Sequence, residues 1–120
     1  MTVAAIAPHE RISAAIRRAC GRNPALVAFL TAGFPRRELF RTQLSAVAGV
    51  ADVVEIGVPF TDPMADGLTI QRSSREALAQ GVTLRWILDE LAAMQAVNAP
   101  LLLMSYLNPL LAYGLERLPA

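Results

Sequence analysis

Three short apolar segments, separated by segments with helical periodicity, constrain the fold of this chain more than any other feature. The apolar segments span residues 25–31, 52–57 and 100–105, a length typical of strands rather than helices. They are mostly apolar along their length rather than alternating cleanly between apolar and polar residues, as are strands that helices cover on both faces of a sheet. Strands of this kind alternating with helices predict a parallel α/β sheet.

Helical periodicity accounts for the residues beside these strands. Apolar residues recur there at spacings of three and four, which places them on one face of a helix. We expect helices over residues 9–20, 37–48, 69–80 and 83 to about 97, a turn or short helix over 107–112, and a final helix from about Tyr113. The expected order is helix, then β-α-β-α-α-β-α.

Residues that begin or end helices support these boundaries. Gly21 and Gly81 follow the first and third helices, and glycine is common just after a helix C-terminus. Thr83 has the side chain of a good N-cap, and Val82 and Ile87 are spaced for a hydrophobic staple across it.

Composition bounds the size and the partners of the protein. With 120 residues, 54% of them hydrophobic, we expect one domain over residues 1–120, too small for a complete large α/β enzyme. The net charge of +1 gives no reason to expect a nucleic-acid partner, and no apolar stretch reaches the about 18 residues of a membrane helix.

The single cysteine, Cys20, cannot form an internal disulfide. Together with the lack of a signal peptide, this suggests a cytoplasmic protein. Cys20 lies on the apolar stripe of the first helix, where we expect a small core residue, whereas His9 is expected at the surface.

Glu55 is the most unusual residue of the expected sheet, because a carboxylate within a buried strand is costly unless it is paired or functional. Alternation along the strand places Val54, Ile56 and Val58 on one face and Glu55 on the other. In a barrel that second face is the interior, near the C-terminal mouth where active sites lie. A purely structural Glu55 would need a basic partner, and the neighbouring strands contain none.

The same alternation brings other side chains to the face of Glu55. Phe29 and Thr31 share that face in the first strand, and Met104 and Tyr106 share it in the third. An aromatic and apolar wall with a few polar groups is what a small-molecule pocket requires. Core packing is the alternative role for Phe29 and Tyr106.

A second carboxylate, Asp66, lies near the end of the loop 58–68, which is rich in proline and glycine. Two carboxylates in different settings, one enclosed and one on a loop, are typical of acid–base catalysis. The alternative is that Asp66, which precedes a glycine, only forms a turn, as Asp62 before Pro63 would. No segment has the spacing of a P-loop, a dinucleotide-binding loop or a metal site.

Three motifs resemble one family. Residues 55–67, EIGVPFTDPMADG, are similar to the signature of the tryptophan synthase α subunit family, as are FLTAGFP at 29–35 and MSYLNP at 104–109. The motifs keep the family's order and spacing over essentially the whole chain. The resemblance implies an α/β fold of the (β/α)8 TIM barrel type, of which this chain would supply the first three βα units, the N-terminal portion.

The resemblance also implies the chemistry. The family is a carbon–carbon lyase of tryptophan biosynthesis that cleaves indole-3-glycerol phosphate to indole and glyceraldehyde 3-phosphate in a retro-aldol reaction. By resemblance, Glu55 is the general acid/base at the ring carbon, and Asp66 stabilises the indole nitrogen as the ring becomes positively charged. The expected substrate-binding residues are Phe29, Thr31, Met104 and Tyr106.

A partner is implied in the same way. The loops that carry Pro59, Asp62 and Asn108 resemble the surface that meets a β subunit, which receives indole through a tunnel and joins it to serine. The expected complex is an α2β2 heterotetramer. Pyridoxal phosphate belongs to the β subunit, so the resemblance implies no cofactor for this chain.

The chain departs from the family in two ways. Leu68 stands where the family usually has proline, and a complete barrel needs about 250 residues. We therefore expect an N-terminal piece, inactive alone because it lacks the phosphate site, with open sheet edges and an uncovered inner face. Two alternatives remain open: a non-catalytic fragment that docks on the β subunit, and another phosphate-sugar barrel enzyme with a similar front half.

Overall fold

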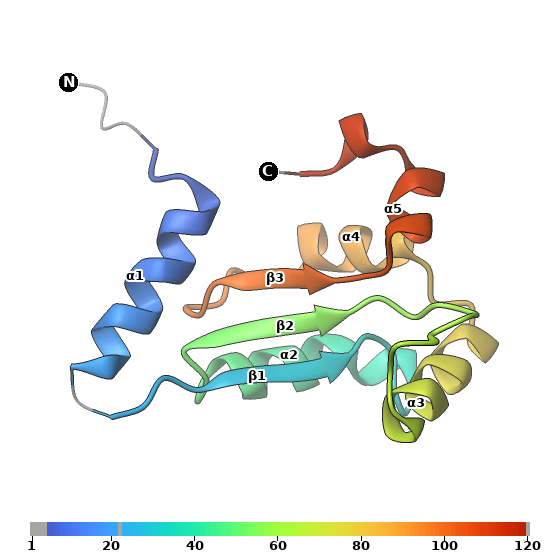
Figure 1. Ribbon diagram of the computed structural model, residues 1–120, viewed down its shortest axis with the longest axis horizontal. Coiled ribbons are helices and arrows are strands. Elements are labelled where there is room, and N and C mark those ends of the chain that lie inside the picture. The colour runs from blue at the N-terminus through green and yellow to red at the C-terminus, as the bar shows by residue number, and fades with distance from the viewer. Residues whose placement is uncertain (1–4, 22, 120) are drawn as a thin grey trace.

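A parallel three-stranded sheet lies at the centre of the protein (Figure 1). The computed structural model describes residues 5–21 and 23–119. The strands are β1 (Val27–Thr31), β2 (Val53–Gly57) and β3 (Leu101–Met104), and β2 pairs with both of the others. The predicted parallel α/β sheet is therefore confirmed, and its strands follow one another in chain order.

The helices follow the expected order. They are α1 (Pro8–Cys20), α2 (Phe40–Ala48), α3 (Leu68–Ala79), α4 (Leu84–Ala93) and α5 (Leu107–Tyr113), with single 3-10 turns at Arg37–Leu39 and Leu115–Arg117. The expected turn or short helix over 107–112 is α5.

Two of the expected helices are wrong in extent. The helix expected to reach about Val97 ends at Ala93, and Met94 is already extended. An α4 of 10 residues is about 15 Å long, close to the length of β3, so the chain must turn back there although apolar periodicity continues. The final helix expected from about Tyr113 is one 3-10 turn, because Gly114 has a φ of +105° that interrupts it.

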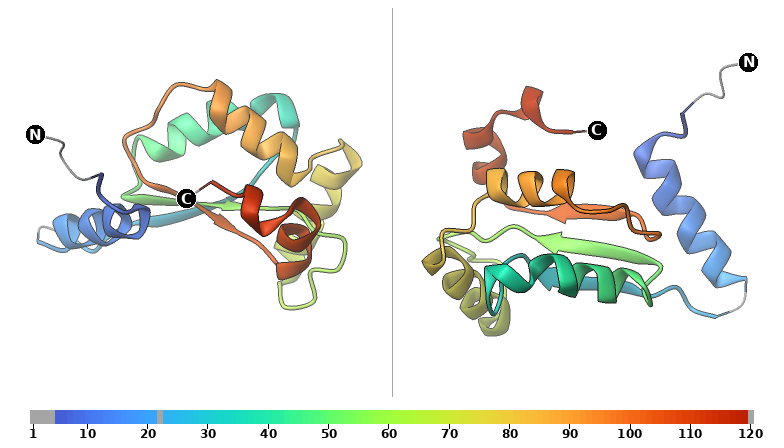
Figure 2. Two further views of the ribbon diagram at one scale, coloured as in Figure 1. Left: turned by 90° about the horizontal axis from the view of Figure 1, so that it is seen from above. Right: turned by 180° about the vertical axis from the view of Figure 1, so that it is seen from behind.

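The hydrophobic core lies between one face of the sheet and two helices. Both views of Figure 2 show α2 and α4 side by side on that face. Val54 and Ile56 of β2 are completely buried there, as the alternation predicted, together with Phe40 and Leu44 of α2. Trp86 of α4 is half-buried, with its ring centroid 5.5 Å from that of Phe40.

The opposite, inner face of the sheet is largely uncovered. Val27 is 43% exposed, Phe29 37% and Met104 48%. The expectation that helices cover both faces of the strands is therefore wrong for this face in the described part of the chain, and the expected open inner face is confirmed. Within that part, β1 and β3 each pair with a single strand.

Helix α1 lies beside the N-terminal ends of the strands and is only loosely packed (Figure 1). None of its residues is fully buried. Cys20 is exposed, so its predicted place in the core is wrong: the apolar stripe of α1 is only half-buried because little of the sheet lies against it. His9 is exposed, as expected. No helix within residues 5–21 and 23–119 has the length and apolar character needed to cross a membrane.

The predicted helix ends are mostly confirmed. Gly81 has a φ of +81°, and the Val82 amide donates to the Ala77 carbonyl, as in the glycine-containing Schellman motif. The Trp86 amide donates to Oγ1 of Thr83 over 3.1 Å, which confirms the N-cap of α4. Gly21 follows α1 but keeps right-handed helical angles, so it does not form a left-handed cap.

Candidate active site

The inner face of the sheet carries the side chains that strand alternation predicts. The pairing of the strands sets which of them lie side by side in a row. Phe29 lies opposite Glu55, and Glu55 lies opposite Leu102 in β3. Glu55 is half-buried, and its carboxylate forms neither a hydrogen bond nor an ion pair with the described residues. A carboxylate on an open apolar face without a cation is available for a ligand or for chemistry.

The next row of the inner face lies one pair nearer the C-terminal ends of the strands. It consists of Thr31, Gly57 and Met104. Gly57 leaves room for the ring of Phe29, because a Cβ built on this glycine would lie 2.5 Å from Cζ of that ring. A residue larger than glycine here would displace the Phe29 ring, so this position shapes the aromatic wall.

The loop between β2 and α3 places Asp66 above these rows. The Tyr106 hydroxyl donates to Oδ2 of Asp66 over 3.1 Å and accepts a hydrogen bond from the Ala65 amide over 2.9 Å. Nε2 of Gln71, in the first turn of α3, donates to the Asp66 carbonyl over 2.9 Å. Leu68, where the family usually has proline, is the first residue of α3 and is exposed, so the helix forms without that proline.

A cavity of about 160 Å³ joins the loop to the strand ends. Five of the six predicted catalytic and substrate-binding residues line it: Phe29, Thr31, Asp66, Met104 and Tyr106. Glu55 is the sixth. It precedes Gly57 of the lining by two residues on the same face, a distance of roughly 7 Å along the strand. The structure thus brings the candidate residues to one end of the sheet and places Glu55 just outside the cavity itself.

Two serines of α3 were not anticipated from the sequence. Ser73 and Ser74 are buried; Ser74 lines the cavity, and the Ser73 hydroxyl lies 2.7 Å from that of Thr31. This bond ties α3 to the C-terminal end of β1. Their position on the buried face of an amphipathic helix could have predicted a polar contact, because small polar residues that are buried need a polar partner.

The residues predicted to meet a β subunit also lie at this end of the molecule. Asp62 and Asn108 are exposed, whereas Pro59 is buried and presents no surface of its own. Thr61 donates to Oδ2 of Asp62 over 3.0 Å, which orders the tip of the loop.

The largest cleft, of about 630 Å³, lies at the opposite end of the strands, between α1 and the loops that precede them. Arg11 and Arg18 line it, and Oδ2 of Asp52 accepts a hydrogen bond from the Leu26 amide. None of the predicted site residues lies there. The smaller cavity is therefore the better candidate site, since it collects the convergent polar groups and the aromatic wall. Within the described residues, no three histidine, cysteine or acidic side chains cluster as a metal site.

Comparison with known proteins decides the family. A family model described as Tryptophan synthase alpha chain matches residues 17–120. The chain belongs to the tryptophan synthase alpha chain family. The resemblance of its motifs is thereby confirmed, and so is its assignment to the α/β fold of TIM barrels, of which the described residues form three βα units.

Curated relatives support the same conclusion. The tryptophan synthase alpha chain of Nitratidesulfovibrio vulgaris (strain DP4) is 56% identical over 102 residues, which cover 83% of this chain and 39% of the relative. That of Desulfovibrio desulfuricans is 54% identical over 111 residues, covering 91% of this chain and 42% of the relative. The chain thus spans about two fifths of the length of these relatives.

Solved structures share the fold. Tryptophan synthase from M. tuberculosis, in an open form with BRD0059 bound, superposes with a TM-score of 0.80 at 31% identity, over 88% of this chain and 43% of that one. Tryptophan synthase subunit alpha from Legionella pneumophila superposes with a TM-score of 0.75 at 36% identity, over 87% and 41%.

Proposed function

We propose that this chain contributes the acid–base groups and part of the indole pocket to the cleavage of indole-3-glycerol phosphate into indole and glyceraldehyde 3-phosphate. The observation that carries the proposal is the cavity in which Asp66 and Tyr106 meet the apolar ends of the strands, with Glu55 free on the same face. Family membership supports the reaction class, a carbon–carbon lyase of tryptophan biosynthesis.

The two carboxylates have separate roles in this proposal. Glu55, protonated, gives its proton to the indole carbon that bears the glycerol side chain. Asp66 accepts a hydrogen bond from the indole nitrogen and stabilises the positive charge that the ring then carries. The carbon–carbon bond then breaks and its electron pair returns to the ring. The neighbouring hydroxyl passes its proton to the Glu55 carboxylate left by the first step and becomes the aldehyde.

The surroundings of each carboxylate are compatible with its role. The Glu55 carboxylate has no cation or hydrogen-bond donor among the described side chains, so it is free to contact a substrate on the inner face. Asp66 accepts the Tyr106 hydroxyl at one oxygen, and this bond holds the carboxylate while leaving Oδ1 for a ring N–H. Phe29 and Met104, on the exposed inner face, offer an apolar surface for the indole ring.

We further propose that the chain acts with a tryptophan synthase β subunit, in an α2β2 complex located in the cytoplasm. The exposed Asp62, on the loop after β2, and Asn108, in the first turn of α5, would face that subunit. In this proposal pyridoxal phosphate is held by the β subunit and this chain carries no cofactor.

The test is a chimaera in which residues 17–120 replace the matching part of the Nitratidesulfovibrio vulgaris relative. Indole release from indole-3-glycerol phosphate is measured with and without a β subunit, beside the isolated chain. Turnover by the chimaera, lost when Asp66 is changed to Asn, supports the proposal. A folded chimaera that binds and stimulates a β subunit without releasing indole would instead indicate a docking role.

A further inference from the structure

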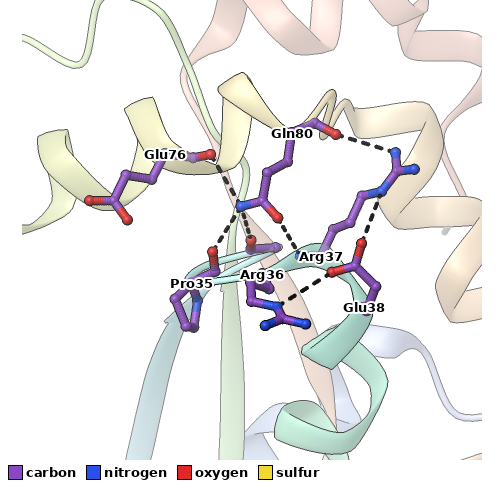
Figure 3. A network of polar contacts seen from close by, with 7 residues as sticks. Pro35, Arg36, Arg37, Glu38, Glu76 and Gln80 are labelled. Atoms are coloured by element: carbon purple, nitrogen blue, oxygen red, sulfur yellow. Dashed lines mark hydrogen bonds and ion pairs between the residues drawn. The ribbon is translucent and has the colours of Figure 1, made fainter.

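Gln80 joins the C-terminal end of α3 to the loop that follows β1 (Figure 3). Its Nε2 donates to the carbonyls of Gly33, over 3.2 Å, and Pro35, over 2.9 Å, and to that of Glu76, over 3.2 Å, in its own helix. Its Oε1 accepts from the Arg37 amide over 2.9 Å. One side-chain amide thus satisfies backbone groups on both sides of the loop, which only a group that both donates and accepts can do.

Arg37 completes the link in the other direction. Its guanidinium donates to the Gln80 carbonyl over 3.2 Å, one of the carbonyls that a helix C-terminus leaves without a partner. Backbone packing tightens the same contact: Gly33 has a φ of +85°, and a Cβ there would lie 2.4 Å from Cγ2 of Val82. The loop and the end of α3 are therefore held together by reciprocal hydrogen bonds and by close packing.

The other end of α3 carries the candidate site. Asp66 precedes α3 by two residues, and Gln71 in the first turn bonds the Asp66 carbonyl. Midway along the helix, Ser73 bonds Thr31 at the end of β1. A rigid helix of 12 residues, about 18 Å long, thus connects the loop after β1 with the Asp66 loop.

We propose that Gln80 is a positioning residue: by fixing α3 to the loop after β1, it sets where Asp66 and Ala65 lie relative to Tyr106. The reason is mechanical. The Asp66 loop forms no strand, so its place above the cavity depends on its contacts with the hydroxyl and ring of Tyr106 and on the placement of α3. Loss of the Gln80 side-chain bonds leaves two described hydrogen bonds that hold α3 to β1 and the loop after it: the one between Ser73 and Thr31, and the one from the Arg37 guanidinium to the Gln80 carbonyl.

Amide hydrogen exchange of the whole chain, resolved by NMR, tests this without any need for turnover. Gln80→Met keeps the length of the side chain and removes its donors and its acceptor. Gln80→Glu keeps the acceptor for the Arg37 amide but turns a carboxylate toward the carbonyl oxygens. Gln95→Met, at an exposed position after α4, is the matched control.

We expect exchange at the amides of Ala65 and Asp66 to become about tenfold faster in Gln80→Met and at least as fast in Gln80→Glu, because an α3 held less firmly to the loop after β1 lets the Asp66 loop open more often. The Trp86 amide, bonded to Thr83, should keep its rate, as should every amide in Gln95→Met. Exchange at Ala65 and Asp66 within twofold of the unmodified chain, with Arg37 alone affected, would overturn the proposal.

Two further measurements separate a positioning role of Gln80 from a general loss of structure. If Gln80→Met also accelerates exchange in β2, Arg37→Ala is measured instead. It removes the guanidinium bond to the Gln80 carbonyl and the exposed ion pair with Glu38 and leaves the Gln80 side chain in place, and faster exchange at Ala65 and Asp66 would again support the proposal. The second measurement rests on the proposed function: in the chimaera, Gln80→Met should lower kcat about tenfold with KM little changed, since positioning acts on the reacting geometry. A folded but inactive parent chimaera would contradict the proposed function. It would not affect the exchange result, which does not depend on turnover.

Discussion

The Tyr106 hydroxyl lies 3.1 Å from Oδ2 of Asp66 and 2.9 Å from the amide nitrogen of Ala65, so one side chain of the third βα unit orders the loop of the second. Tyr106 also stacks its ring against Phe60 of the same loop, with centroids 5.1 Å apart. The tyrosine therefore has two separable contributions, one from its ring and one from its hydroxyl.

Tyr106→Phe should separate them. The ring contact with Phe60 is kept, while the bonds to Asp66 and Ala65 are lost. We expect kcat/KM of the chimaera for indole-3-glycerol phosphate to fall about tenfold, with little change in the free energy of unfolding, since the hydroxyl is only part-buried. A steady-state assay and a urea titration measure the two quantities. Wild-type kinetics would show that this hydroxyl does not place Asp66.

Glu55→Gln keeps the shape of the side chain and removes its proton chemistry. We expect turnover of the chimaera to fall by about 10²–10⁴, the usual contribution of a general acid or base, with the fold unchanged by circular dichroism. Glu76→Gln, on α3 with 43% of its side chain exposed, is the matched control and should keep full turnover. If Glu55→Gln is as active as its parent, the proton at the ring carbon comes from another group.

Gly33→Ala should destabilise the fold strongly. The new Cβ would lie 2.4 Å from Cγ2 of Val82, and a φ of +85° is unfavourable for alanine. We expect a loss of about 2–4 kcal/mol in the free energy of unfolding, measured by urea titration. Gly21→Ala is the control, since its φ is −71° and its Cβ meets nothing closer than 3.7 Å; it should change stability by less than about 0.5 kcal/mol.

The ion pair between Arg41 and Glu90 predicts a pH-dependent stability. The Arg41 guanidinium donates to both Glu90 oxygens, over 2.6 and 3.1 Å, and this bond lowers the pKa of Glu90 below its ordinary value of 4.5 against the opposing effect of burial. A lowered folded-state pKa gives stability that is present above pH 4.5 and is lost as the pH falls through the folded value.

Glu90→Gln should therefore be less stable than the parent chain at pH 6, and the difference should vanish below the folded pKa of Glu90. Thermal unfolding at a series of pH values measures it. The double variant Arg41→Gln/Glu90→Gln should match Glu90→Gln throughout the range. A difference that persists at low pH would mean that Glu90 acts through packing and not through its charge.

Most of the secondary structure followed from local patterns, and the errors have tertiary causes. Thr83 and Gly81 were recognised because capping depends on neighbouring residues alone. The end of α4 at Ala93 was missed because it is set by the return of the chain to β3. Cys20 was placed in the core on the periodicity of α1, but periodicity does not reveal how much of the sheet that helix contacts.

The candidate site was predicted in part. Strand alternation placed Phe29, Glu55 and Met104 on one face, since the side-chain period of two is a local property. The sequence does not predict the bond of Thr31 to Ser73 or the hydrogen bonds of Gln80 to the loop after β1. They join groups 42 to 47 residues apart, and no sequence spacing encodes such a meeting.

By itself, the sequence determined the alternation of strands and helices, the faces of the strands and the family, because periodicity, capping and motif are properties of neighbouring residues. The tertiary structure decided which face of the sheet is covered, where Tyr106 meets Asp66 across 40 residues, and how α3 is held above the cavity. Those outcomes depend on how packed elements share space and on hydrogen bonds that form only once the chain has folded back on itself.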